Sequence, residues 1–97
     1  MSREKNSKSR AIITVIGQDK IGTVAEVSNF LAKNLINIEE ISQTVLADIF
    51  TMTMLVDLSR SSLNIAELAE KLAKMGAKIN HEIHVHDEKI FDAMHRV

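Results

Sequence analysis

The sequence predicts a single α+β domain, in which a four-stranded antiparallel sheet carries two helices on one face. The 97-residue chain has the length of one domain, and its apolar fraction of 45% and charged fraction of 26% are typical of a soluble globular protein. Stretches that alternate between apolar and polar residues are interleaved with stretches whose apolar residues recur every three or four positions. This interleaving indicates strands and helices that follow one another along the chain.

The first half of the chain predicts a strand, a helix and a second strand. Residues 11–16, "AIITVI", are apolar and rich in β-branched side chains, as in a buried strand. Apolar residues recur at helical spacing over residues 23–34, and Thr23 or Gly22 is the expected N-cap. Residues 36–47 predict the second strand, with an irregularity at its glutamate pair, and residues 47–49 predict a turn.

The second half of the chain repeats this order. Residues 50–58 alternate with period two, which places Met52 and Met54 in the core. Residues 61–64 offer polar caps for a second helix that is expected to run to residue 75. Gly76 then stands where a left-handed C-cap is expected.

The rest of the chain completes the predicted topology. Residues 77–86 alternate again and predict the fourth strand. The order of elements, with right-handed crossovers, is that of the ferredoxin-like βαββαβ sandwich. Residues 87–96 predict a short C-terminal helix, acidic at its start and basic at its end, within a domain of residues 10–97. Residues 1–9 are basic and nearly free of apolar side chains, so we expect a disordered tail and not a signal peptide.

The composition excludes several classes of protein. With no cysteine, the chain has no disulfide, thiolate zinc site or cysteine nucleophile, which fits a reducing cytoplasm. A net charge of −1 provides no overall attraction for nucleic acid or for an anionic membrane. No window approaches the ~20 consecutive apolar residues of a membrane span. We therefore expect a cytoplasmic protein that binds neither nucleic acid nor membrane.

The loop "GQDKIG", residues 17–22, is the first candidate site. It joins the first strand to the first helix, and the N–H groups at a helix N-terminus favour an anion. Gly17 permits a sharp turn, Gly22 lets a ligand approach the backbone, and Asp19 could receive an ammonium group. An amino-acid zwitterion suits such a loop. The alternative is an ordinary β–α turn in which both glycines serve backbone geometry alone.

The segment "ITVIGQDKIGTVAEVSNFLAKNLINIEEISQ" resembles the signature of the ACT domain family. The residues that carry the resemblance are Gly17, Asp19, Lys20, Gly22, Ala25, Leu31, Asn37 and Ile38. One departure is Ile21, where many ACT domains have proline. Residues 11–97 as a whole are similar to small stand-alone ACT proteins of bacteria and archaea, which contain one module and no catalytic domain.

The resemblance implies a regulatory module that binds an amino acid or a similar ligand between two identical subunits, without cofactor or catalysis. The implied ligand contacts are Gly17, Gln18, Asp19, Lys20, Ile21, Gly22, Thr23, Asn37 and Ile38. Asn37 has an alternative role as the left-handed C-cap of the first helix. A second hypothesis is a dimerisation or interaction module with a vestigial ligand site. In either case, regulation would act on a protein partner in trans.

The histidines of "HEIHVH" offer weaker candidates. His84 and His86 lie two positions apart on a predicted strand, on one face with Glu82, whereas His81 points to the other face. Zinc needs three or four converging ligands, so His84 and His86 are weak metal candidates and a solvated sheet surface is the alternative. No nucleophile, base and orienting group converge in the sequence, so we do not expect an enzyme.

Overall fold

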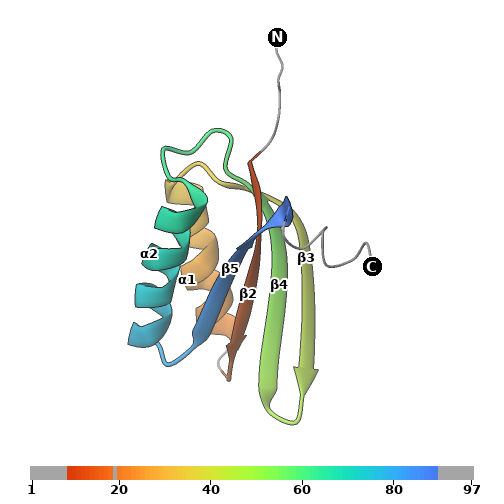
Figure 1. The fold of residues 1–97 in the computed structure, drawn as a ribbon. Helices are drawn as coiled ribbons and strands as arrows, with labels where there is room; N and C mark the ends of the chain where they lie inside the picture. Colours follow the sequence, from red (N-terminus) through yellow and green to blue (C-terminus); the bar gives the residue numbers. More distant parts are fainter. Residues whose placement is uncertain (1–8, 19, 90–97) are drawn as a thin grey trace.

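The fold is the predicted ferredoxin-like sandwich. The computed structural model describes residues 9–18 and 20–89, apart from the side chain of Lys20. Its elements are β2 (Arg10–Gly17), α1 (Lys20–Lys33), β3 (Asn37–Leu46), β4 (Ile49–Asp57), α2 (Ile65–Lys78) and β5 (Glu82–Asp87). The strands form one antiparallel sheet in the order β3-β4-β2-β5, with both helices on the same face (Figure 1).

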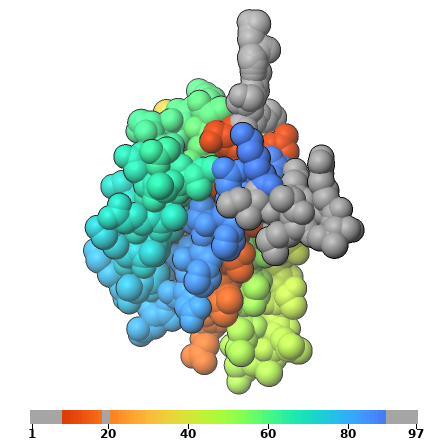
Figure 2. Space-filling model, viewed as in Figure 1, coloured from red at the N-terminus to blue at the C-terminus, as the bar shows by residue number. Residues whose placement is uncertain are grey.

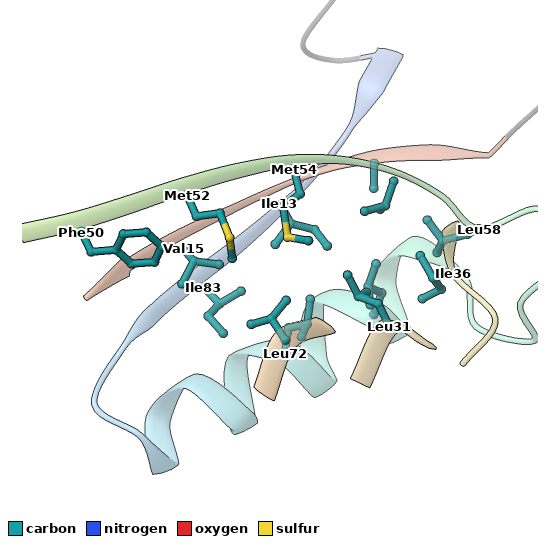
Figure 3. Packing of buried hydrophobic residues seen from close by; sticks show 14 residues of the cluster. Ile13, Val15, Leu31, Ile36, Phe50, Met52, Met54, Leu58, Leu72 and Ile83 are labelled. Atoms are coloured by element: carbon teal, nitrogen blue, oxygen red, sulfur yellow. The ribbon is translucent and has the colours of Figure 1, made fainter. Parts of the chain in front are cut away.

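The core lies between the sheet and the two helices (Figure 3). On β4, Met52 and Met54 are completely buried, which confirms that the period-two alternation of this strand marks its core face. Leu72 of α2 packs into the same cluster. The other buried apolar residues are Ala11, Ile13, Val15, Val27, Leu31, Ile36, Phe50, Val56, Leu58, Leu68 and Ile83.

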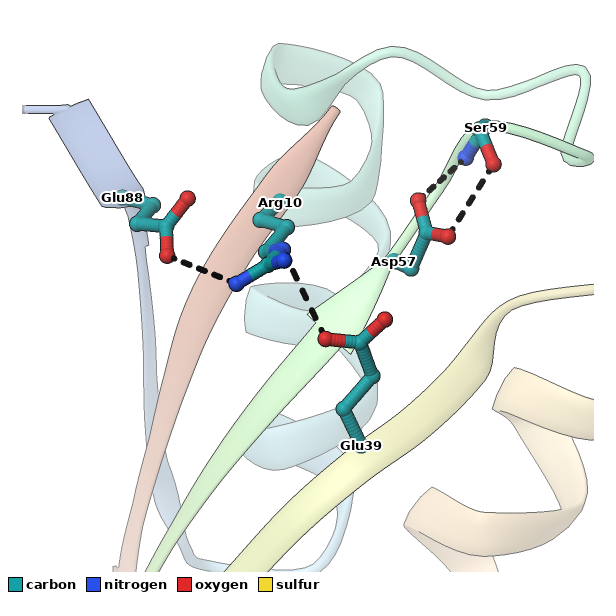
Figure 4. Close-up of polar contacts among 5 residues, drawn as sticks. All are labelled: Arg10, Glu39, Asp57, Ser59 and Glu88. Atoms are coloured by element: carbon teal, nitrogen blue, oxygen red, sulfur yellow. Dashed lines mark hydrogen bonds and ion pairs between the residues drawn. The ribbon is translucent and has the colours of Figure 1, made fainter. Parts of the chain in front are cut away.

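The strand irregularity predicted at the glutamate pair is present. The pairing of β3 with β4 shifts register between Ile38 and Glu40, which is a β-bulge at Glu39. The guanidinium of Arg10 lies 3.5 Å from a carboxylate oxygen of Glu39 and 3.2 Å from one of Glu88 (Figure 4). Arg10 therefore links the bulge to the end of β5.

The β3–β4 turn is tighter than expected. Ala47 and Asp48 both have positive φ, 49° and 69°, which is the conformation of a two-residue type I′ hairpin turn. This turn matches the right-handed twist of its flanking strands, so the hairpin continues almost to its tip.

The predicted start of the first helix was wrong. The helix α1 begins at Lys20, so Thr23 lies within its first turn and neither Thr23 nor Gly22 is the N-cap. The cap predicted for the second helix is present, since the Asn64 side chain accepts from the Glu67 N–H and the Glu67 side chain accepts from the Asn64 N–H. This reciprocal pair is a capping box.

The predicted end of the second helix was also wrong. The helix α2 continues to Lys78, and Gly76 is buried inside it, without positive φ. A Cβ at Gly76 would lie 2.7 Å from the carbonyl oxygen of His81, so this glycine permits a close approach of backbone. The left-handed residue is Asn80, with φ 58°, and the fourth strand accordingly begins at 82 and not at 77.

The first helix ends in a similar way. Leu35 has φ 58°, and the N–H of Ile36 donates to the carbonyl of Leu31 at 2.9 Å, as in a Schellman motif. The left-handed cap is therefore Leu35, and Asn37 is instead the first residue of β3. The predicted C-cap role of Asn37 was wrong.

Two predicted segments fall at the ends of the described chain. Glu88 and Lys89 are helical, and the rest of the predicted C-terminal helix lies outside the described residues, as do residues 1–8 of the predicted tail. Ser9 is described, and its carbonyl accepts a hydrogen bond from the Leu58 N–H at 2.8 Å.

The outer strand β3 is poorly covered. Every residue from Glu40 to Leu46 is exposed, and Ile41 and Val45 keep 45% and 60% of their surface in contact with solvent. Figure 2 shows the yellow-green tip of the β3–β4 hairpin standing away from α2 at the lower right. An exposed edge strand of this kind is able to pair with another strand.

Candidate ligand-binding site

The glycine loop is shorter than the sequence suggested. β2 ends at Gly17 and α1 begins at Lys20, so the connection between them consists of Gln18 and Asp19. Gln18 and Ile21 are exposed, the latter by 84%, and Gly22 is partly buried in the first turn of α1. Asp19 and the side chain of Lys20 lie outside the described parts of the chain. Gly17 and Gln18 thus lie just before a helix N-terminus, as predicted.

Gly17 makes room for a histidine. A Cβ on Gly17 would lie 1.7 Å from Cδ2 of His81 and 2.5 Å from its Cγ, far inside the contact distance of real atoms. Because Gly17 does not have positive φ, its lack of a side chain serves this close approach and not an unusual turn. One glycine of the loop is therefore required by packing inside the chain.

His81 ties three segments together through its two ring nitrogens. Its Nδ1 lies 2.6 Å from the carbonyl oxygen of Ile79, which only accepts, so Nδ1 carries a proton and donates. In the neutral ring, Nε2 is then an acceptor, and the Thr23 hydroxyl donates to it at 2.6 Å. Thr23 is 1% exposed. His81 thereby joins the end of β2, the first turn of α1 and the α2–β5 turn.

An open groove of about 460 Å³ lies beside this assembly. The end of β2, the tip of the β3–β4 hairpin and the turn that leads into β5 line this groove. Its lining residues are Ile16, Gly17, Gln18, Ile49, Ile79, Asn80 and His81.

Asn37 lies at the opposite end of the sheet from the loop. Gly17 is paired with Phe50, whereas Asn37 is paired with Asp57. Phe50 and Asp57 are seven positions apart on β4, so at about 3.3 Å per residue the two regions are about 23 Å apart. Asn37 is exposed, and Ile38 beside it is half-buried against the core. One chain does not bring the two predicted parts of the site together.

The predicted metal candidates face solvent. His84 and His86 are exposed on the helix-free face, opposite Thr14 and Ile12 of β2, and Nε2 of His84 lies 3.2 Å from a carboxylate oxygen of Glu82. Over residues 9–18 and 20–89, no three side chains of the kind that bind metal gather at one place. His81 points to the other face, toward the helices, as predicted.

From the sequence, His81 had no predicted partner. Asp57 and Arg60, which line a groove with Asn37, had no predicted role. The period of two placed His81 correctly on the helix-side face. Its partners Gly17 and Thr23, however, belong to the other half of the chain, and no local spacing reveals such a contact.

Within the described part of the chain, neither helix is long and apolar enough to cross a membrane.

Comparisons with known proteins identify close relatives of this chain. The sequence profile of the ACT domain family matches residues 9–86. The chain is 48% identical over 89 residues to the UPF0237 protein of Methanopyrus kandleri, covering 92% of this chain and 99% of that one. It is 50% identical over 86 residues to the UPF0237 protein of Methanococcus maripaludis, covering 89% and 96%.

Solved structures agree with this relationship. An ACT domain protein from Streptococcus pneumoniae superposes with a TM-score of 0.77 at 40% identity, over 89% of this chain and 96% of that one. A putative glycine cleavage system transcriptional repressor superposes with a TM-score of 0.71 at 15% identity, over 89% of this chain and 51% of that one. The second likeness is one of fold alone.

Proposed function

The chain belongs to the ACT domain family, and from this premise we propose that it is a non-catalytic, cytoplasmic regulatory module that binds an amino acid or a similar small ligand between two identical subunits. ACT domains are regulatory ligand-binding modules. The proposed site comprises Gly17, Gln18, Asp19, Lys20, Ile21, Gly22, Thr23, Asn37 and Ile38.

The separation of the loop from Asn37 is the observation that carries the proposal. These parts of the site lie about 23 Å apart in one chain at a strand rise of 3.3 Å, too far for one amino acid to touch both. A two-fold axis between two subunits would bring the loop of one chain close to Asn37 of the other. If two β3 strands pair antiparallel at their edges, the Asn37 end of one sheet meets the loop end of the other.

The edge of β3 supports such a pairing. It is an outer strand of ten residues, and its helix-side residues Ile41 and Val45 are exposed apolar side chains. An antiparallel pair of β3 strands would extend the sheet and cover these side chains against the β3 strand of the other subunit. The same proposed dimer thus accounts for both the exposed strand edge and the division of the site.

The two halves of the site differ in chemistry. The first turn of α1 offers backbone N–H groups and the positive end of a 14-residue helix to a ligand carboxylate. Asn37 offers an amide that both donates and accepts hydrogen bonds. The Thr23 hydroxyl is already bonded to His81, so we assign the contact at Thr23 to its backbone.

A thermal-shift screen against the twenty amino acids tests the proposal. A ligand at 100 times its Kd adds ~2.7 kcal/mol to the free energy of unfolding, a rise in Tm of about 10 °C or more in a domain of this size. Asn37→Ala is expected to weaken binding of the active amino acid by about 10- to 100-fold, because it removes a hydrogen bond to a charged ligand group. Asn29→Ala, at an exposed position of α1, is the matched control and should bind as the wild type does.

A second candidate function is a dimerisation module that acts on a protein partner and retains only a vestigial ligand site. The bond between Thr23 and His81 and the packing of His81 on Gly17 favour it, because these loop residues already have partners within the chain. A dimer that is well folded and gives no shift with any amino acid would support this function over the first.

A further inference from the structure

A small groove next to Asn37 has the composition of an amino-acid site. Its volume is about 360 Å³, and its lining residues are Leu35, Ile36, Asn37, Asp57 and Arg60. They come from the exit of α1, the first residue of β3, the last residue of β4 and the turn that follows β4. A cation, a carboxylate, an amide and the exposed Leu35 thus meet at one end of the sheet.

The carboxylate in this groove is held in place by its neighbour. One oxygen of Asp57 accepts from the Ser59 N–H at 2.9 Å, and the other accepts from the Ser59 hydroxyl at 3.1 Å (Figure 4). A carboxylate has about four acceptor positions, so two remain for a ligand. The Asp57 carboxylate is therefore held in position and can still accept hydrogen bonds from a ligand.

The side chains of the cation and the amide have no partners among the described residues. Among residues 9–18 and 20–89, no carboxylate lies within ion-pair distance of the exposed Arg60 guanidinium. The exposed side chain of Asn37 likewise makes no hydrogen bond to another residue of these ranges. Asp57 shares the groove with Arg60, yet its oxygens bond to Ser59.

We infer that this groove binds the α-ammonium group and part of the α-carboxylate group of the ligand. Asp57 and Asn37 hold the ammonium, and Arg60 shares the roughly four acceptor positions of the carboxylate with the α1 N-terminus of the other subunit. A guanidinium presents parallel N–H donors that match the two oxygens of a carboxylate. The remaining acceptor positions of Asp57 and the Asn37 amide oxygen suit an ammonium group. The inference rests on the proposed function and adds Arg60 and Asp57 to its site.

An apolar side chain of the ligand could pack against the apolar wall of the groove. Leu35 keeps 59% of its surface exposed although it occupies the left-handed position where glycine is usual. Its side chain lines the groove beside Ile36. An apolar amino-acid side chain would cover Leu35 while the charged end of the ligand faces Arg60.

The test measures affinity by calorimetry for the amino acid that gives the largest shift in the screen, and for the carboxamide of that amino acid, which lacks the negative charge. The proteins are wild type, Arg60→Gln and the control Lys71→Gln, which removes an exposed cation from α2. Arg60→Gln should weaken binding of the amino acid by about 10- to 100-fold, the range for a hydrogen bond to a charged group. Lys71→Gln should leave it unchanged.

The carboxamide identifies the ligand group that Arg60 contacts. Wild type should prefer the acid over the carboxamide by about 10- to 100-fold, and Arg60→Gln should reduce this preference to about threefold or less. If the wild type binds an amino acid and Arg60→Gln keeps both the affinity and the preference for the acid, the assignment of Arg60 is wrong. The proposed function would still stand in that case. A wild type that binds no amino acid overturns the proposed function, and this inference with it.

Discussion

Gly17→Ala is expected to lower the free energy of unfolding by about 2–4 kcal/mol. The new methyl group would lie 1.7 Å from the His81 ring, so the ring must leave its place. Overpacking costs about 1–3 kcal/mol, and each hydrogen bond that the displaced ring loses, to Ile79 and to Thr23, contributes about 1 kcal/mol. Urea unfolding at a fixed protein concentration measures the change, because the stability of the proposed dimer would depend on concentration.

A double-mutant cycle shows whether His81 is the cause. In the His81→Ala background the ring is absent, and Gly17→Ala should then cost less than about 1 kcal/mol. The backbone at Gly17 lacks positive φ, so alanine introduces no strain of its own there. Equal costs of Gly17→Ala in the two backgrounds would show that the glycine serves something other than the approach of His81.

Ile41→Lys combined with Val45→Lys is expected to convert the proposed dimer into a folded monomer. Both side chains are exposed in the single chain, at 45% and 60%, so the substitutions should leave its core intact. In an antiparallel β3 pair they would place positive charges of the two chains near one another, and lysine on an edge strand opposes pairing. We expect the dimer dissociation constant to rise at least about 100-fold, as measured by sedimentation equilibrium.

The matched control adds the same charge elsewhere. Ala66→Lys combined with Ala73→Lys places two lysines at exposed positions of α2 and should leave the dimer unchanged. A wild type that sediments as a monomer, or a doubly substituted β3 that still dimerises, would contradict the β3 interface.

The elements that the sequence predicted best are those whose period appears directly in the burial of their side chains. The alternation of β4 places Met52 and Met54 in the core because every second residue of a strand faces the helices. The helix ends were harder to predict. Both exits use a left-handed residue other than glycine, Leu35 and Asn80, whereas Gly76 serves a close contact inside α2.

The arrangement of the candidate site was harder to predict from the sequence than the elements of the fold. The glycine loop and Asn37 were identified from the sequence, but the register of the sheet decides that they lie at opposite ends. Gly17 was interpreted through its neighbours in sequence, although its reason lies in His81, which belongs to the other half of the chain. Such contacts follow from how the two βαβ halves pack, and a single sequence read along its length does not contain them.

Subunit mixing tests most directly the claim that one site is built from two chains. Gly22→Val, which blocks the approach to the first turn of α1, and Asn37→Ala should each lose binding of the amino acid found in the screen. When the two variants are unfolded together and refolded, each mixed dimer should contain one intact site and one doubly altered site. Calorimetry should then recover about a quarter of the wild-type binding sites, the share expected for random two-fold pairing. If mixing restores no sites although mixed dimers form, the loop and Asn37 do not share a ligand across the interface.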